Sequence, residues 1–190
     1  VIYLKYRWLC GFLGLEKQKE KTMKVYFSHG KESGPWGSKI QRLASIASEH
    51  GCTVDSIDYT DLMDPDQRVE RLRDILNNEE ESFILVGSSM GGYVSLVAAD
   101  DVKAHAVFLL APALYIPGYQ QQRYDPATRH VEIIHGWSDD VIPPEHSIRF
   151  AKEAGCTLHL IDGDHRLNGS IEMVEDLFGR FLCRVLLDKT

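Results

Sequence analysis

Short apolar runs alternate with longer amphipathic stretches from residue 24 to the end of the chain. Runs such as Phe83–Val86 and Ala106–Leu110 carry apolar side chains at successive positions, which is typical of strands buried on both faces. In Ser38–His50, by contrast, apolar residues recur at helical spacing, as they do in a helix with one buried face. The pattern therefore predicts strands that alternate with helices.

The predicted elements suffice for one sheet covered on both faces. Strands are expected at residues 25–27, 53–57, 83–86, 106–110, 131–134 and 157–161. Helices are expected at residues 38–50, 65–77, 90–99, 144–154 and 170–187. In the helix at 65–77, Asp64 is the expected N-cap, and the side chains directed inward are Val69, Leu72, Ile75 and Leu76. The sequence thus predicts an α/β fold, a three-layer α/β/α sandwich with a mostly parallel sheet of about six strands.

Residues 1–22 do not follow this alternation. They begin with an apolar, aromatic stretch and continue into the charge run Glu16–Lys21. The apolar part is too short for an ordinary membrane span. We interpret it as an extension upstream of a natural start at Met23, and a membrane-surface or partner-binding helix is the alternative. Residues 23–190 are expected to form a single domain.

Charge and cysteine content narrow the class of protein. The net charge is −7 and no basic stripe is present, which argues against a nucleic-acid surface. The four cysteines are scattered without a Cys-x-x-Cys pair, as expected for reduced thiols in a cytoplasmic protein. Neither a Gly-x-x-x-x-Gly-Lys-Ser/Thr nor a Gly-x-Gly-x-x-Gly motif occurs, and we expect no cofactor. The oligomeric state stays open.

The strongest chemical signal is Gly87-Ser88-Ser89-Met90-Gly91, between a predicted strand and a predicted helix. Gly-x-Ser-x-Gly in that setting is typical of a nucleophile elbow, where a serine sits on a sharp, strained turn. Glycines two residues before and after the serine remove side chains for which there is no room. Ser89 is therefore the candidate nucleophile. A glycine-rich turn or a phosphate-binding loop would be the alternative.

A serine hydroxyl needs a base, which must lie at the same edge of the sheet. Of the eight histidines, His29, His135 and His165 lie in loops just past the C-terminal end of a predicted strand. His29 and His135 precede glycines and are interpreted as structural turn residues. His165 follows the last strand and is the candidate base.

The third group of such a site is a carboxylate that orients the imidazole. Asp139 and Asp140 follow the strand at 131–134. We favour Asp139 for this role, while Asp140 is the alternative and could instead cap the next helix.

Backbone N–H groups are expected to hold the negative charge that develops on the substrate oxygen. One is the N–H of Met90, directly after the candidate nucleophile. By position, the second is the N–H of Lys31, in the loop after the first strand. The connection from Pro112 to Arg129 has no clear helical period and is expected to be a short, partly flexible cap over this edge. A surface loop without chemical consequence is the alternative.

From Lys24 to the C-terminus the chain resembles the α/β-hydrolase fold family, in a small form similar to compact bacterial serine esterases. Three motifs carry the resemblance: His29-Gly30, the Ser89 elbow, and His135-Gly136-x-x-Asp139-x-x-x-Pro143. With His165, the order of the candidate residues is Ser, Asp, His, as in the family. Two leading strands of larger members, a large lid and a Gly-Gly-Gly loop are missing, so the family implies the reaction type more securely than the substrate.

The resulting hypothesis is a serine hydrolase that cleaves small esters or thioesters through Ser89, Asp139 and His165. A non-catalytic binding protein and a peptidase of the same fold are the alternatives. A metal site formed by His159, Asp162, Asp164 and His165 is disfavoured, because no known ligand spacing fits.

Overall fold

Six parallel strands form the sheet in the computed structural model, which describes residues 23–188. They are β1 (Lys24–Ser28), β2 (Thr53–Ile57), β3 (Phe83–Ser88), β4 (Ala106–Leu110), β5 (His130–Gly136) and β6 (Thr157–Ile161). Their order across the sheet is β2-β1-β3-β4-β5-β6. The parallel sheet predicted from the sequence is confirmed. The interpretation of residues 1–22 lies outside the described residues.

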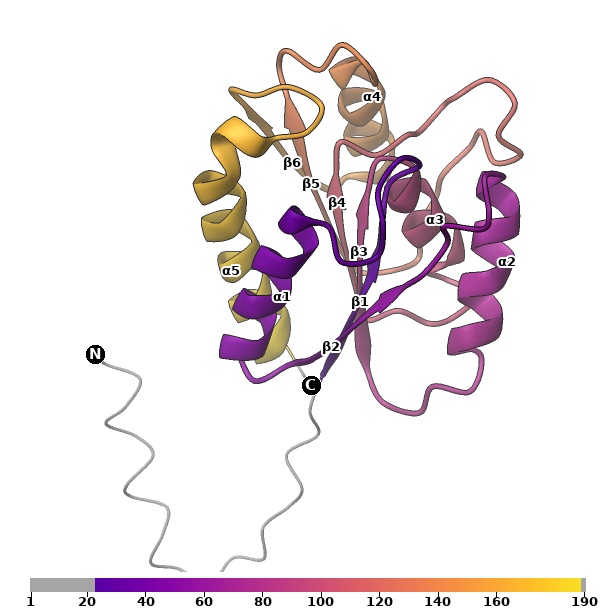
Figure 1. Cartoon of the computed structure of the whole chain (residues 1–190), viewed down its shortest axis with the longest axis vertical. Coiled ribbons are helices and arrows are strands. Elements are labelled where there is room, and N and C mark those ends of the chain that lie inside the picture. Colours follow the sequence, from indigo (N-terminus) through magenta and orange to yellow (C-terminus); the bar gives the residue numbers. More distant parts are fainter. Residues whose placement is uncertain (1–22, 189–190) are drawn as a thin grey trace, which may run out of the picture.

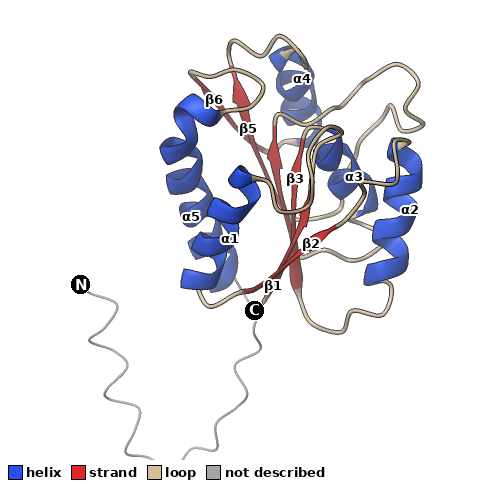
Figure 2. Ribbon diagram, in the orientation of Figure 1, coloured by secondary structure: helices blue, strands red, loops and turns tan. Residues whose placement is uncertain are grey.

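Helices cover both faces of the sheet and make three layers (Figures 1 and 2). The α-helices between residues 23 and 188 are α1 (Ser38–Glu49), α2 (Pro65–Leu76), α3 (Met90–Ala98), α4 (Pro144–Ala154) and α5 (Ile171–Leu187), with a short 3₁₀ helix, η1 (Asn168–Ser170), before α5. One face packs against α1 and α5, and the other against α2, α3 and α4. The predicted α/β/α sandwich is therefore present.

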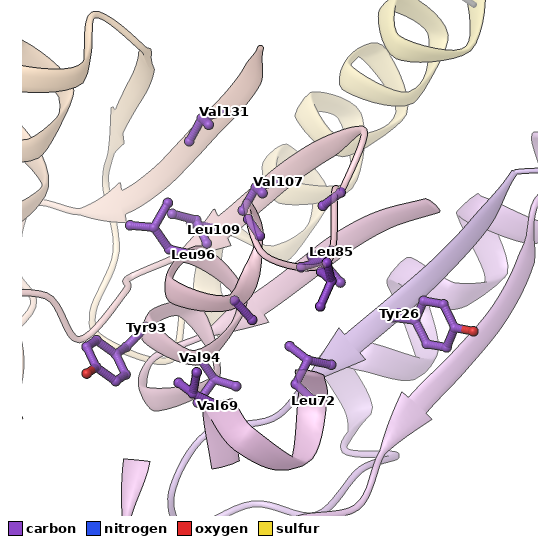
Figure 3. Close-up of a cluster of buried hydrophobic side chains, with 14 of the residues drawn as sticks. Tyr26, Val69, Leu72, Leu85, Tyr93, Val94, Leu96, Val107, Leu109 and Val131 are labelled. Atoms are coloured by element: carbon purple, nitrogen blue, oxygen red, sulfur yellow. The ribbon is translucent and has the colours of Figure 1, made fainter. Parts of the chain in front are cut away.

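The core lies in two apolar layers, one on each face of the sheet. On the face of α2 and α3, Leu72 and Val94 meet Leu85 and Val107 of the central strands (Figure 3). Full burial of such a side chain stabilises the fold by about 1.5–3 kcal/mol. Because β3 and β4 are apolar on both faces, they occupy the middle of the sheet and form a rigid base for the loops at its carboxyl edge.

The start of α2 confirms one sequence prediction, and its last turn corrects another. The Asp64 side chain caps the helix by accepting hydrogen bonds from the N–H groups of Asp66 and Gln67. Ile75, expected to point inward, is 47% exposed. Val69, Leu72 and Leu76 define the centre of the buried face, and Ile75 lies at its margin.

The long connection between β4 and β5 is held by hydrogen bonds near its middle and at its C-terminal end. The carboxylate of Asp66 accepts hydrogen bonds from the Tyr93 hydroxyl and from the N–H of Gln120. Asp100 accepts hydrogen bonds from the N–H groups of Ala127 and Thr128. The first of these anchors lies where α2 begins, at the carboxyl edge of the sheet, and the second lies where α3 ends and β5 begins, at the opposite edge.

Candidate active site

Ser89 occupies the sharp turn between β3 and α3, in a backbone conformation that L-residues rarely adopt. Its φ is 55° and its ψ is −120°. Its N–H donates to the carbonyl of Leu110 at 2.9 Å, and its carbonyl accepts from the N–H of Ala113 at 2.9 Å. A residue held in such a region costs about 1–3 kcal/mol and persists only where its surroundings fix it. Here the hydrogen bonds to Leu110, at the end of β4, and to Ala113, in the loop that follows, fix it.

The two glycines of the elbow allow backbone segments to approach closely. A Cβ at Gly87 would lie 2.2 Å from the carbonyl oxygen of Gly91. A Cβ at Gly91 would lie 2.0 Å from the carbonyl oxygen of Ser28, at the end of β1. Both distances are far below van der Waals contact, so the predicted reason for these glycines is confirmed.

Three side chains from separate loops form one hydrogen-bonded chain. The hydroxyl Oγ of Ser89 lies 3.0 Å from Nε2 of His165, and Nδ1 of His165 lies 2.7 Å from Oδ2 of Asp139. With Nδ1–H donating to the carboxylate, Nε2 is free to accept the serine proton. The Asp139 side chain is fully buried, and that of His165 is 17% exposed. The structure thus brings together the three side chains that the sequence selected.

Asp139 is held as a carboxylate by donors on all sides. Its Oδ1 accepts hydrogen bonds from the N–H groups of Val141 at 2.9 Å and Ile142 at 2.8 Å. Burial alone would raise the pKa of Asp139, but hydrogen bonds from Ile142, His165 and Val141 hold that pKa below its ordinary value. The group beside His165 is therefore a negative charge at neutral pH.

Asp140 does not take part in this chain. It is exposed, and Pro143 is the N-cap residue of α4, without a side-chain capping bond. The suggestion that Asp140 caps this helix is wrong. It is Asp139 that organises the turn through its bonds to the backbone.

His135 also contacts Asp139, which the sequence did not indicate. Its Nε2 lies 3.0 Å from Oδ2 of Asp139 and 2.9 Å from the carbonyl of Ile142, and its Nδ1 lies 2.7 Å from Oγ of Ser147. Two acceptors at Nε2 require the proton there, so Nδ1 accepts from the serine hydroxyl. Burial lowers the pKa of His135, so the ring is neutral. Its position four residues before Asp139 was the available sequence signal.

His29 is likewise buried and structural, as interpreted from the sequence. The N–H of Tyr59 donates to Nε2 of His29 at 3.0 Å, so Nδ1 carries the proton that goes to the carbonyl of Gly30 at 2.7 Å. Burial lowers the pKa of His29. This neutral ring ties the loop after β1 to the loop after β2.

The two backbone N–H groups selected from the sequence border the same cleft as Ser89. Met90 and Lys31 both line it. Within residues 23–188, neither N–H is engaged by a backbone or side-chain acceptor. Both donors are therefore available to a ligand oxygen, and Met90 begins α3, where helix N–H groups favour negative charge.

The cleft has a volume of about 760 Å³ and opens to solvent. Ile116 and Tyr119, from the connection between β4 and β5, form part of its wall. Lys39, in the first turn of α1, also lines it, and its Nζ donates to the carbonyl of Arg166 at 3.0 Å. Burial lowers the pKa of Lys39 to about 8, although Asp164 and Asp139 act in the opposite direction.

The residues considered for a metal site do not converge. His159 contacts Glu132, through Nε2 at 2.7 Å from the carboxylate, while the carboxylate of Asp164 accepts hydrogen bonds from the N–H groups of Arg166 and Leu167. Among residues 23–188, no three His, Cys, Asp or Glu side chains lie where they could hold a metal ion together. Within the same range, no helix has the length and apolar character that a membrane span requires.

Solved structures with the same architecture cover 85–90% of the chain. A Xanthomonas campestris protein of the α/β-hydrolase superfamily is 30% identical, with a TM-score of 0.79, over 85% of this chain and 99% of that one. Est1E from Butyrivibrio proteoclasticus is 19% identical, with a TM-score of 0.75, over 90% of this chain and 91% of its own. The ydeN gene product of B. subtilis is 17% identical, with a TM-score of 0.72, over 85% of this chain and all (100%) of its own. At these lower identities, the last two show the fold alone.

Sequence comparison gives a family as well. No curated protein matches the chain significantly. The sequence model of the uncharacterised protein family UPF0227 matches residues 23–135, which is more than half of the chain and contains the elbow. Together with the 30% identity to the Xanthomonas protein over almost all of that protein, this match decides the assignment. The chain belongs to the UPF0227 family, within the α/β-hydrolase superfamily.

Proposed function

We propose that the protein is a serine hydrolase that cleaves carboxylic esters or thioesters of small acyl substrates. The observation that carries the proposal is the continuous chain from Ser89 Oγ through both nitrogens of His165 to Asp139, with distances of 3.0 and 2.7 Å. A nucleophile within reach of a base, which a third group orients, is the arrangement that acyl transfer needs.

The proposed reaction has two stages. His165 Nε2 takes the Ser89 proton as the hydroxyl oxygen attacks the carbonyl carbon, and the N–H groups of Met90 and Lys31 hold the resulting oxyanion. The tetrahedral species collapses, and the leaving alcohol or thiol takes its proton from His165. Water then attacks the acyl-enzyme with His165 as base, which releases the acid and restores Ser89. Asp139 stabilises the imidazolium in both stages.

The cleft supports a small acyl group. Its volume of about 760 Å³ is in the range of small-molecule sites, and it is open to solvent. Ile116 and Val141 contribute apolar surface to the cleft that Ser89 lines, which suits a short acyl chain. A structure of Est1E holds ferulic acid, and this relative shares the fold.

Two other functions are compatible with the family. A non-catalytic binding protein would not require the Ser89–His165–Asp139 hydrogen bonds, which is why we favour catalysis. A peptidase remains the second enzymatic candidate, and no feature of the cleft favours an extended peptide.

Turnover of p-nitrophenyl esters of increasing chain length tests the proposal. We expect hydrolysis that favours short chains, and a fall in kcat on the order of 10⁴ or more in Ser89→Ala. Ser88→Ala is the matched control, because Ser88 is the neighbouring serine and has no place in the proposed mechanism. Substantial activity in Ser89→Ala, or no activity in the wild type with any ester or thioester, would reject the proposal.

A further inference from the structure

Arg68 is a fully buried cation that forms no ion pair within the described part of the chain. It lies in the first turns of α2 and has no exposed surface. No carboxylate of residues 23–188 lies within 4.0 Å of its guanidinium, although the neighbouring Arg71 pairs with Asp61. A buried charge without a partner is costly unless hydrogen bonds satisfy it. The contacts of Arg68 therefore require an explanation.

Carbonyl oxygens of two loops surround the guanidinium. Its Nε donates to Leu62 at 2.7 Å and its Nη2 to Tyr59 at 3.2 Å, both in the loop between β2 and α2. Its Nη1 donates to the carbonyls of His29 and Gly30, each at 3.3 Å, in the loop after β1. The guanidinium also lies over the Tyr59 ring, 5.3 Å from its centre. The planar fork of Arg68 thus joins the loop after β1 to the loop after β2.

These contacts fix the direction of one peptide group. The carbonyl of Gly30 accepts from Nδ1 of His29 at 2.7 Å and from Arg68 at 3.3 Å, so it points into the protein. A trans peptide group is planar, and its N–H points opposite to its carbonyl. The N–H of Lys31 consequently points away from Arg68. The peptide also lies beside the nucleophile, since a Cβ at Gly30 would be 3.6 Å from Cβ of Ser89.

We propose that Arg68 is a positioning residue that holds the Gly30–Lys31 peptide with its N–H directed at the oxyanion. Its charge, which forms no ion pair with a carboxylate of residues 23–188, also favours the negative charge of the tetrahedral intermediate. This inference rests on the proposed function. It assigns a role in the reaction to a residue that does not touch the substrate, and it accounts for an arginine that is buried without an ion pair to any carboxylate of residues 23–188.

The test compares Arg68→Gln and Arg68→Lys with Arg71→Gln, a matched arginine of the same helix whose partner is the exposed Asp61. We expect kcat to fall about 10- to 100-fold in Arg68→Gln, part of the loss seen when an oxyanion donor is removed, with KM within about two-fold of wild type. Arg68→Lys keeps the charge but not the planar fork of donors, so its kcat should lie between those of the wild type and Arg68→Gln. Arg71→Gln should match the wild type in both constants.

Two further readouts separate positioning from loss of folding. Urea unfolding gives the folded fraction, to which kcat is normalised. A trifluoromethyl ketone, which forms a tetrahedral oxyanion with the serine, should bind more weakly in Arg68→Gln by the same factor as kcat falls. If Arg68→Gln does not fold, Arg68→Lys gives the same comparison, with kcat and ketone affinity reduced together.

An unchanged kcat per folded molecule in the Arg68 variants would overturn the inference. So would a loss of kcat with undiminished affinity for the ketone. In either case an active wild type would leave the proposed function standing. A wild type that hydrolyses no ester and does not bind the ketone would overturn both.

Discussion

The two sides of the cleft are organised around buried charges of opposite sign. Beyond β5, the carboxylate of Asp139 is surrounded by donors: two backbone N–H groups and two imidazoles. Beyond β1 and β2, the guanidinium of Arg68 is surrounded by acceptors, all of them backbone carbonyls. A neutral, buried histidine accompanies each charge: His135 beside Asp139, and His29 beside Arg68.

This difference corresponds to the charges that the proposed reaction would create. The imidazolium of His165 would form beside Asp139, on the negative side of the cleft. The oxyanion would form on the side that contains Arg68, the positive side. Each buried charge would thus be most stabilising in the transition state, when the opposite charge appears on its own side. In the ground state, where Ser89 and His165 are uncharged, the two buried charges stabilise less. This difference between ground state and transition state is the differential stabilisation that catalysis requires.

Removing the negative charge should have the largest effect. In Asp139→Asn the shape of the side chain remains, but the amide favours the wrong tautomer of His165 and cannot stabilise its cation. We expect kcat for an ester to fall on the order of 10⁴-fold. Asp140→Asn is the matched control and should change kcat little, since Asp140 is exposed. Equal losses in the two variants would contradict the assignment of the acid.

Replacing a glycine by alanine should destabilise the fold on the negative side of the cleft, at Gly136, and should not do so on the positive side, at Gly30. A Cβ at Gly136 would lie 2.3 Å from the carbonyl oxygen of Gly163, in the loop that carries His165. A Cβ at Gly30 would meet nothing closer than 3.5 Å. We expect Gly136→Ala to lose about 1–3 kcal/mol of unfolding free energy or more.

Gly30→Ala should remain within about 1 kcal/mol of the wild type, because its conformation is open to alanine. Urea unfolding of both variants makes the measurement. Similar stabilities would show that the two sides are packed alike.

The smallest expected effect concerns pH and the neutral His135. Burial lowers its pKa in the folded protein, so below about pH 6.5 the unfolded chain takes up a proton that the folded ring does not. This difference reduces the free energy of unfolding as the pH falls from 7.5 to 5. In His135→Gln that part of the loss should disappear, while His29, which has the same sign of shift, continues to contribute. The urea midpoint at the two pH values measures it, and an unchanged pH dependence in His135→Gln would contradict the neutral assignment.

The sequence was sufficient where local pattern and chain order determine the structure. Apolar or alternating runs placed the six strands of residues 23–188, and the position of Ser89, Asp139 and His165 after three of them brought those side chains to one edge. Parallel strands make this inference possible, because their carboxyl ends share an edge. The assignment of Asp64 as the cap of α2 was correct for a similarly local reason.

The sequence was insufficient where a side chain serves a segment far away in the chain. Arg68 contacts the loop at His29 and Gly30, which no local rule connects with α2. The one available signal was its spacing, because Arg68 precedes the buried Leu72 by one helical turn. A charged residue next to an apolar stripe is normally expected at the exposed margin of the helix, whereas Arg68 is buried. Ile75 is the opposite case, an apolar residue that was expected to be buried and is 47% exposed.

Active-site labelling with a fluorophosphonate, followed by peptide mass spectrometry, tests most directly whether Ser89 is an activated nucleophile. We expect a single adduct, on Ser89, that forms much more slowly in His165→Gln and at the normal rate in His159→Gln, whose histidine contacts Glu132 instead. An unlabelled wild type, or an adduct that persists in Ser89→Ala, would contradict the assignment.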